Sequence, residues 1–489
     1  MDETNKTTVI RNAAWLVAWD EATGGHEYRR DCDLAFRGNS IVHVGSGCGG
    51  PGYEGPADEV IAGERLMVMP GLVNIHSHPL SEPLGKGFFE DLGNPRLGMS
   101  GLFDYMPVYG PDEAGMGVCA EVAYAELLKS GVTTLVDLSV PYPGWLELLA
   151  ASGLRGIVAP MHRSARWRCD NGHEVTYDWS PDGGEASFRA ALEVIDRALN
   201  HESGRLGAMV TPAQIDTCTP ELLKASHAAA RERGVPFQIH AAQSLVEFHE
   251  MTRRHGMTPL EWLASLDLLG PGTIVAHCIF IDSHSWIYWG ERDDFQRLAA
   301  SGAAVAHCPN VFVRHGMLLE SFARYREAGI PLGLGTDTFP HNMLEEMRLA
   351  CLLGRVAERR VEGTTTADVF AAATIGGAQA LDREDIGRLA PGAKADVVLV
   401  DLDAPTMQPL RDPLRSLIFA AAERAVRDVY VDGKQVVRDG EVVTLDLTAA
   451  LTRLETLRGK AEAEVPAKHW SGRPGHEVAP LALPLAPDG

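Results

Sequence analysis

The chain has 489 residues, which is too many for one core of ordinary size, so one large domain and a smaller one are expected. Its 44 basic and 66 acidic residues leave a net charge of −22, which argues against a nucleic-acid backbone or an anionic membrane surface as a partner. No segment is apolar for long enough to span a membrane, and the polar first residues lack the apolar core of a signal peptide. Eight scattered cysteines without a CxxC pair are typical of a reduced cytoplasmic protein.

Both ends of the chain are predicted to form strands. Short apolar or alternating runs occur at 8–10, 14–19, 33–36 and 40–44, and again at 396–400, 426–431 and 434–437. Asp432-Gly433, between the last two runs, is a strong hairpin signal. We therefore expect residues 1–68 and 391–445 to pack together as one small domain of strands.

The middle of the chain, residues 69–390, alternates helical and strand patterns about eight times. This alternation favours a parallel sheet, and about eight units predict a (β/α)8 barrel, so the expected fold class is α/β. Residues 446–489 are expected to form a charged helix followed, from Pro466, by an extended arm rich in Pro and Gly. Such an arm would contact a neighbouring subunit, so a homo-oligomer is expected.

His76 and His78 lie at the end of a predicted buried strand, in the segment 70–78. Because residues two apart on a strand point to the same face, both imidazoles face the same side. In a parallel barrel, the carboxyl ends of the strands carry the chemistry. The pair therefore predicts half of a transition-metal site.

Three later strand patterns also end in a residue that can bind a metal ion, namely His240, His277 and Asp337. Zinc-like ions prefer nitrogen and carboxylate ligands, and in catalytic sites they keep one position open for water. Asp337 can bind the ion, accept a proton from its water and deliver that proton later, so it is predicted to be catalytic.

Eight segments carry a resemblance to a known family: PGLVNIHSH (70–78), LGKG (84–87), GVTTLVD (131–137), QIHAAQ (238–243), VAHC (275–278), VAHCPN (305–310), GLGTD (333–337) and IGRLAPGAKADVVLVD (386–401). With them the chain resembles the amidohydrolase superfamily over nearly its whole length. The resemblance is to the branch of cytosine deaminases and triazine hydrolases. It implies a distorted (β/α)8 barrel with a small β-sandwich formed by both chain ends.

The resemblance also assigns roles to individual residues of this chain. It implies that four side chains bind the metal ion: His76, His78, His240 and Asp337. His277 falls at the position that contacts the substrate, where it polarises a carbonyl or orients the water, so it is the second predicted catalytic residue. His307 lies in a segment that lines the pocket in this family, although a purely structural strand-end histidine is an equal alternative.

Two departures from the family pattern narrow the expected number of metal ions and the expected class of substrate. Members with two metal ions use a carboxylated lysine at the end of the fourth strand, and residues 208–214 of this chain contain no lysine. We therefore expect one divalent transition metal per subunit, with zinc the first expectation and iron, cobalt and manganese as alternatives. The second departure is Gln243, which stands where this branch commonly has a glutamate that protonates a ring nitrogen. Glutamine cannot deliver a proton at neutral pH.

Gln243 favours the hydrolysis of an acyclic urea, carbamate or amide C–N bond, because such a substrate needs no ring protonation. The phenylurea and thiocarbamate (molinate-type) hydrolases within this branch look similar in this respect. The alternative is an aminohydrolase or chlorohydrolase of a nitrogen heterocycle of the cytosine, guanine or s-triazine type. A third hypothesis is a barrel scaffold without catalytic function, which the intact metal-ligand set argues against.

Several further residues are candidates for contact with a small-molecule substrate. We predict such contacts for Gln243, His307, Phe339 and His162, the last with its neighbour Arg163 at the pocket mouth. Glu82 could replace the missing acid, but a loop carboxylate in solvent is the favoured interpretation. The apolar segments 99–107 and 286–289 are candidate pocket walls, and a subunit interface is an equal alternative.

Overall fold

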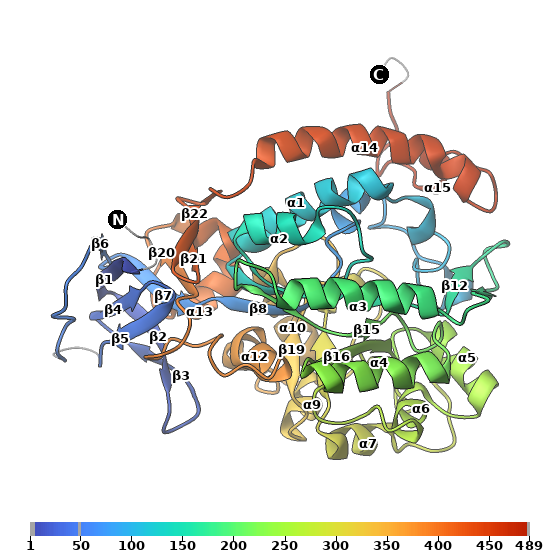
Figure 1. Cartoon of the computed structure of the whole chain (residues 1–489), viewed down its shortest axis with the longest axis horizontal. Coiled ribbons are helices and arrows are strands. Elements are labelled where there is room, and N and C mark those ends of the chain that lie inside the picture. The colour runs from blue at the N-terminus through green and yellow to red at the C-terminus, as the bar shows by residue number, and fades with distance from the viewer. Residues whose placement is uncertain (1–4, 47–49, 487–489) are drawn as a thin grey trace.

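The computed structural model describes residues 5–46 and 50–486. The predictions about Cys48 and about residues 1–4 lie outside the described residues. Figure 1 shows a strand-rich domain on the left and a larger domain of alternating strands and helices on the right. Across the described ranges, no helix combines the length and the apolar character needed to cross a membrane.

The strand-rich domain is a sandwich of two sheets built from both ends of the chain. One sheet has the order β5 (Ser40–Val44), β4 (Cys32–Arg37), β1 (Thr7–Ala13), β6 (Glu59–Ala62). The other has the order β23 (Glu441–Val442), β22 (Lys434–Arg438), β21 (Val426–Val431), β20 (Val397–Asp401), β7 (Leu66–Pro70), β2 (Trp15–Asp20), β3 (Gly25–Arg29). Alternate side chains such as Ile10, Phe36, Val68 and Leu399 fill the space between the sheets. Asp432-Gly433 forms the predicted turn between β21 and β22.

The larger domain is a closed barrel of parallel strands. Around it run β8 (Leu72–Ser77), β9 (Val132–Asp137), β10 (Arg155–Val158), β14 (Leu206–Ala208), β16 (Phe237–Ala241), β17 (Thr273–His277), β18 (Ala304–His307) and β19 (Leu332–Leu334). Regular pairing stops between β14 and β16 and between β19 and β8. Single bridges, Val210 with Phe237 and Ser77 with Asp337, close the barrel at these two places. The barrel is therefore distorted, as expected.

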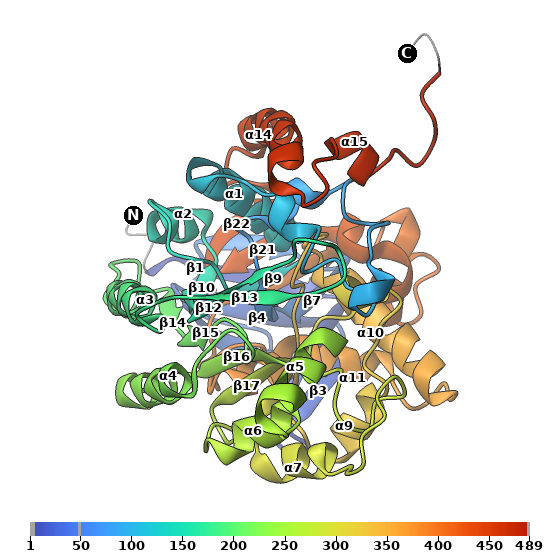
Figure 2. The ribbon, with the colours of Figure 1, turned by 90° about the vertical axis from the view of Figure 1, so that its right-hand side faces the viewer.

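Helices surround the barrel, as Figure 2 shows from a second direction. They are α1 (Glu113–Lys129), α2 (Trp145–Ser152), α3 (Glu185–Leu199), α4 (Pro220–Arg233), α5 (Leu245–His255), α6 (Pro259–Ser265), α7 (Asp294–Ser301), α8 (Pro309–Val313), α9 (Phe322–Glu327), α10 (Met343–Glu358), α11 (Thr366–Ala371) and α12 (Gly377–Ala380). Local sequence sets where several begin. Thr258 and Glu261, for example, form a capping box at the start of α6. The predicted fold class, an α/β barrel with a β-sandwich from both chain ends, is confirmed.

The C-terminal segment differs from the prediction. Pro466 does not begin an extended arm, because it lies inside α14 (Leu447–Lys468), and a short helix α15 (Gly475–Val478) follows. Val465 and Val478 pack into a cluster with Leu84, Phe88 and Tyr109 of the same chain. Figure 1 shows α14 lying alongside α1. Val465 and Val478 are thus buried against other parts of the same chain.

Candidate active site

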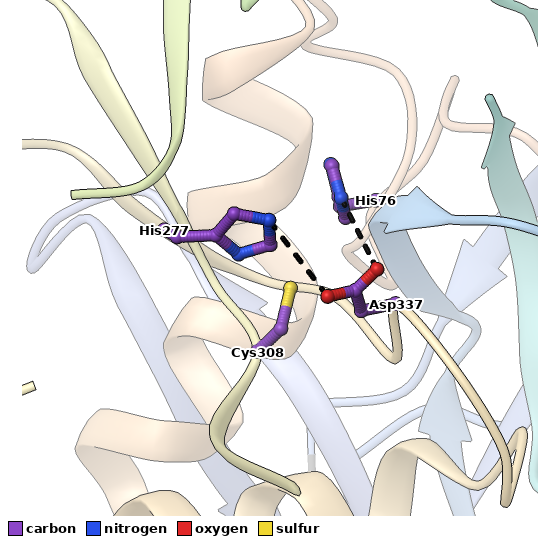
Figure 3. Close-up of side chains that lie close together, drawn as sticks. All are labelled: His76, His277, Cys308 and Asp337. Carbon is purple, nitrogen blue, oxygen red and sulfur yellow. Dashed lines mark ion pairs between the residues drawn. The ribbon is translucent and has the colours of Figure 1, made fainter. Parts of the chain in front are cut away.

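The carboxyl ends of β8, β16, β17 and β19 bring five ligand-type side chains together. Asp337 Oδ1 lies 3.5 Å from His76 Nε2 and 3.3 Å from His78 Nε2, and its Oδ2 lies 3.7 Å from His277 Nε2. His78 Nε2 is also 3.3 Å from His240 Nε2. Figure 3 shows that His76 and His277 face different oxygens of the Asp337 carboxylate. The five residues predicted from the strand ends therefore form one group.

The backbone at these strand ends is unusual. Ala242, His277 and Asp337 have φ values of 55°, 76° and 57°, in the left-handed region that residues other than glycine rarely adopt. The surrounding structure holds them there. The Asp337 N–H donates to the carbonyl of His76, and the His78 N–H donates to the carbonyl of Asp337, both at 2.9 Å. Such conformations cluster at functional sites, because they turn side chains toward a common point.

Hydrogen bonds on the far side of the imidazoles orient three of them. Nδ1 of His78 donates to the carbonyl of Leu138 at 2.9 Å, and Nδ1 of His240 donates to the carbonyl of Ala213 at 2.6 Å. Nδ1 of His76 lies 2.5 Å from Oε1 of Gln238. Each Nε2 is therefore left facing the centre of the group, which is the arrangement typical of metal-binding histidines. Gln238 escaped the sequence analysis, although it lies two residues before His240 on the same face of β16.

Electrostatics favour neutral imidazoles and an ionised carboxylate. Burial lowers the pKa of His78 to about 4 and that of His277 to about 3, and it holds the pKa of His240 well below its usual value. Burial opposes the ionisation of Asp337, but neighbouring imidazoles, His277 first, outweigh it and hold its pKa well below the usual value. Neutral imidazoles and a carboxylate are the forms that bind a metal ion.

The donor set fits one divalent transition metal. Two atoms that each lie about 2.0–2.1 Å from a tetrahedral ion are about 3.3 Å apart, and the Nε2 and Oδ1 distances above are close to this value. Nε2 of His76 is buried without a hydrogen-bond partner, although it faces this centre. Among the described residues that line the adjoining cavity there is no lysine that could hold a second ion.

Cys308 belongs to the same neighbourhood. Its Sγ lies within 4.8 Å of donor atoms of His76, His277 and Asp337, and Figure 3 shows it beside them. Burial raises the pKa of this thiol well above its usual value, so Cys308 is no nucleophile at neutral pH.

A cavity of about 320 Å³ opens over the candidate metal ligands. This volume lies at the lower end of the range of small-molecule sites, about 300–1,000 Å³. Gln243 lines the cavity, as predicted, and so does Arg163. Glu82 lines it as well and is only 4% exposed, so the interpretation as a carboxylate in solvent was wrong. The loop after β8 turns this side chain inward instead.

Three predicted substrate contacts lie outside the lining of this cavity. The His162 ring is buried behind the wall, where Nε2 bonds to the Ser226 hydroxyl at 2.8 Å. His307 is buried beside Phe322, with the ring centroids 5.9 Å apart. Phe339 lies under the Arg314 guanidinium and borders a small neighbouring pocket. The structure thus gives these three side chains protein neighbours within the described chain.

The two predicted pocket walls differ in their placement. The segment 99–107 contributes Ser100, Leu102 and Met106 to the cavity. From the segment 286–289, however, Trp286 and Tyr288 are 45% and 99% exposed, and neither lines the cavity. The opposite wall comes instead from residues that the sequence analysis did not single out, among them Gln214, Phe312, His315 and Met317. They lie on loops and a short helix without a distinctive spacing.

Taken together, a barrel, a His- and Asp-rich centre and a cavity above it define a metal-dependent hydrolase. Comparison with known proteins agrees: residues 67–436 match the amidohydrolase family. The chain therefore belongs to the amidohydrolase family, and the predicted class, a metal-dependent hydrolase acting on C–N bonds, is confirmed.

Individual proteins are similar over most of their length. A 5-methylthioadenosine/S-adenosylhomocysteine deaminase of Natronomonas pharaonis is 30% identical over 410 residues, which cover 83% of this chain and 89% of the relative. An adenosine deaminase from Xanthomonas campestris, solved with bound zinc, has a TM-score of 0.77 at 22% identity and covers 93% of this chain and 98% of that one. A triazine hydrolase from Arthrobacter aurescens also has a TM-score of 0.77 at 22% identity, over 93% and 99% of the two chains.

Proposed function

We propose that the protein is an aminohydrolase that replaces the exocyclic amino group of an adenosine-type heterocycle with oxygen. The similarity to the deaminase of Natronomonas pharaonis carries this proposal, because it extends over 83% of this chain. It favours the heterocycle alternative over the urea or carbamate substrate expected first. The cavity is compatible with such a substrate, since apolar walls accompany a few polar side chains, among them Gln214 and Gln243.

We propose that four residues hold the ion: His76, His78, His240 and Asp337. Zinc is the proposed metal, since the related adenosine deaminase structure contains it. When bound, such an ion lowers the pKa of its water toward neutrality and so makes it a nucleophile. The chain supplies the remaining chemistry through its own side chains.

Asp337 is the proposed proton carrier. Its carboxylate is ionised at neutral pH, so it can accept a proton from the attacking water and pass it to the leaving nitrogen. The neutral imidazole of His277 lies 3.7 Å from Asp337 through Nε2, where it can orient the water or the developing oxyanion. The buried walls exclude bulk water from these groups.

A second candidate function is the hydrolysis of an acyclic urea, carbamate or amide, as in phenylurea or thiocarbamate hydrolases. Gln243 favours it, because an amide side chain cannot protonate a ring nitrogen and an acyclic substrate does not require that step. In this reaction Asp337 would pass its proton to the departing amine, and a urea would give an amine and a carbamic acid that loses CO2.

Product analysis separates the two functions. Zinc-loaded protein is supplied with 5-methylthioadenosine, 5'-deoxyadenosine, cytosine and guanine, and ammonia is measured; an s-triazine and a diarylurea serve as the competing substrates. We expect ammonia from an adenosine-type substrate with kcat/KM of about 10⁴ M⁻¹ s⁻¹ or more, the lower end for enzymes on their own substrates. Aniline release from the diarylurea at a higher kcat/KM, without ammonia from any heterocycle, would replace the first function by the second.

We also propose a cytoplasmic homo-oligomer. The cysteines within the described residues are all free, which supports a reducing compartment. Exposed apolar side chains such as Leu451 and Trp470, on and after α14, support a subunit contact. Light scattering after size-exclusion chromatography tests the assembly, and a mass of 52.8 kDa, that of one chain, would contradict it.

A further inference from the structure

We infer that Glu82 is the acid that delivers a proton to the ring nitrogen of the substrate, in place of the glutamate that is absent at position 243. The inference rests on the proposed function, because a heterocycle is the substrate that requires ring protonation. It gives Glu82 a catalytic role, and it explains how a chain with Gln243 can act on a ring.

The position of Glu82 fits this role. It begins η2 (Glu82–Gly85), a single 3-10 turn that follows β8, and its side chain lines the same cavity as His78, Gln243 and Asp337. Glu82 and Asp337 are the two carboxyl groups among the described residues that line the cavity. Asp337 faces imidazoles through both of its oxygens. Glu82 is therefore the carboxyl group that remains for a second proton transfer.

Burial favours the protonated form of the Glu82 carboxyl. Burial, and then the charge of Asp337, raise the pKa of Glu82 to about 8, while Arg314 and a weak hydrogen bond from the Ser81 hydroxyl at 3.4 Å oppose the rise. The thiol of Cys119 on α1 is also close, and burial raises its pKa to about 12, so it stays uncharged. A neutral carboxylic acid at the pH of the cell can donate a proton.

Arg314 can stabilise the carboxylate that remains after the transfer. Arg314 and Glu82 border the same small pocket beside the main cavity. Nε and Nη1 of Arg314 are buried without a hydrogen-bond partner among the described residues. A buried guanidinium with free N–H groups is strongly favoured next to a carboxylate. Deprotonated Glu82 would supply the negative charge that Arg314 lacks in the resting state.

Other groups around the cavity are poor proton donors at neutral pH. Burial lowers the pKa of His315 to about 4 and that of His277 to about 3, so both imidazoles lack the second proton. Burial lowers the pKa of Arg163, yet a guanidinium stays protonated at neutral pH and does not give up its proton. Glu82 combines a proton with the ability to release it.

Each proton in the proposed reaction has a donor and an acceptor. The attacking water forms the new C–O bond and gives one proton to Asp337, while Glu82 protonates the ring nitrogen. The Asp337 proton then moves to the amino group, the C–N bond breaks and ammonia leaves. The hydroxyl proton of the intermediate returns to Glu82 as the carbonyl forms. Both carboxyl groups end in their starting states, and the ring nitrogen keeps its new proton.

The variant Glu82→Gln tests the inference on the zinc-loaded protein with 5-methylthioadenosine as substrate. We expect kcat/KM to fall about 10²–10⁴-fold, the usual contribution of a general acid. In the double variant Glu82→Gln/Gln243→Glu, the acid returns at the other position, and at least a tenfold recovery of kcat is expected. Glu126→Gln is the matched control, because Glu126 pairs with Lys86 of the same loop but lies outside the cavity lining. It should change kcat by less than threefold.

Two readouts without turnover separate a catalytic from a structural role. A purine ribonucleoside with its ring N1 should bind Glu82→Gln at least tenfold more weakly than wild type, whereas its 1-deaza analogue should bind both equally. The second readout is melting temperature against pH. The folded protein keeps a proton on Glu82 that the unfolded chain releases near pH 4.5, so Glu82 contributes a loss of stability from about pH 4.5 to 8 that Glu82→Gln lacks. The melting temperature of the variant relative to wild type should therefore increase over this window.

The outcomes distinguish the inference from the function on which it rests. Wild-type protein that releases no ammonia from any heterocycle would overturn the proposed function and, with it, the ring-protonating role. Wild-type protein that deaminates while Glu82→Gln keeps its kcat would overturn only the role of Glu82. An equal loss of affinity for the N1 and 1-deaza ligands would show that Glu82 shapes the cavity without donating a proton.

Discussion

Two buried polar clusters of this protein differ in how completely their hydrogen bonds are made. At the junction of barrel and sandwich, Arg155 of β10 donates to both oxygens of Asp396 at 3.1 and 3.0 Å and to Asp432 at 2.9 Å. The Asp432 N–H completes this cluster with a bond to Asp396 at 2.7 Å. At the other end of the barrel, Nε2 of His76 and Nδ1 of His277 are buried without a partner.

The difference indicates what each cluster does. A buried ion pair that leaves none of its buried polar atoms without a hydrogen-bond partner holds two domains in register. Buried polar atoms without partners are costly in a folded chain and persist where a ligand completes them. The first cluster is therefore structural, and the second is the proposed metal site. Four substitutions test this division between a structural cluster and a metal site, in order from the largest expected effect to the smallest.

Asp337→Asn should abolish activity and spare the fold. It removes a proposed metal ligand together with the proton acceptor, so we expect kcat/KM to fall at least about 10⁴-fold. The melting temperature of the metal-free protein should change little, because the carboxylate completes no structural hydrogen-bond network. Steady-state kinetics and calorimetry on the same preparation check this, and an active Asp337→Asn enzyme would contradict it.

Arg155→Ala should do the reverse. It leaves the buried Asp396 and the partly buried Asp432 without their cation, which costs about 3–5 kcal/mol of stability. The protein that remains folded should keep its kcat/KM. Urea unfolding measures the loss, and Arg189→Ala is the control, because its ion pair with Glu185 is exposed and should contribute less than about 1 kcal/mol. Equal losses of stability for Arg155→Ala and Arg189→Ala would contradict a structural role for the Arg155 cluster.

Gln238→Ala tests the outer contacts of the proposed metal site. Without the amide oxygen, the His76 ring loses the partner of its Nδ1, and metal affinity should fall about 10–100-fold. Competition with a chelator measures the affinity. Gln379→Ala, at an exposed position on α12, should leave it unchanged. An unchanged affinity for Gln238→Ala would show that the ring needs no such support.

His162→Gln should have the smallest effect on catalysis. The ring is held by Ser226 behind the cavity wall, so its loss should cost about 1 kcal/mol of stability through that bond and leave KM unchanged. Denaturant unfolding measures the loss of stability, and steady-state kinetics on the same preparation measure KM. A KM that rises tenfold in a fully folded variant would return His162 to the substrate site, as the sequence suggested.

The sequence predicted the barrel and the group of five strand-end residues because both follow from periodicity. His76, His78 and His240 lie on strands whose buried runs can be recognised, and the carboxyl ends of parallel strands meet at one edge. The same periodicity places Gln238 on the face of its strand that carries His240, so its position near the site could also have been predicted. What the sequence could not show is the path of the loops. The burial of Glu82 depends on a single turn after β8, and the side to which His162 points depends on a strand of two residues, β11 (Met161–His162). The start of the tail was misjudged because its Pro- and Gly-rich composition favoured an extended arm from Pro466, whereas the helix continues through Pro466 to Lys468.

A crystal structure of the zinc-loaded protein, with an anomalous difference map at the zinc edge, tests the central claim most directly. We predict one peak per chain at the carboxyl end of the barrel, with three imidazole nitrogens about 2.0–2.1 Å away, from His76, His78 and His240, and Asp337 as the fourth protein ligand. Two peaks, a peak bound through Cys308 instead of Asp337, or no peak at saturating zinc would contradict it.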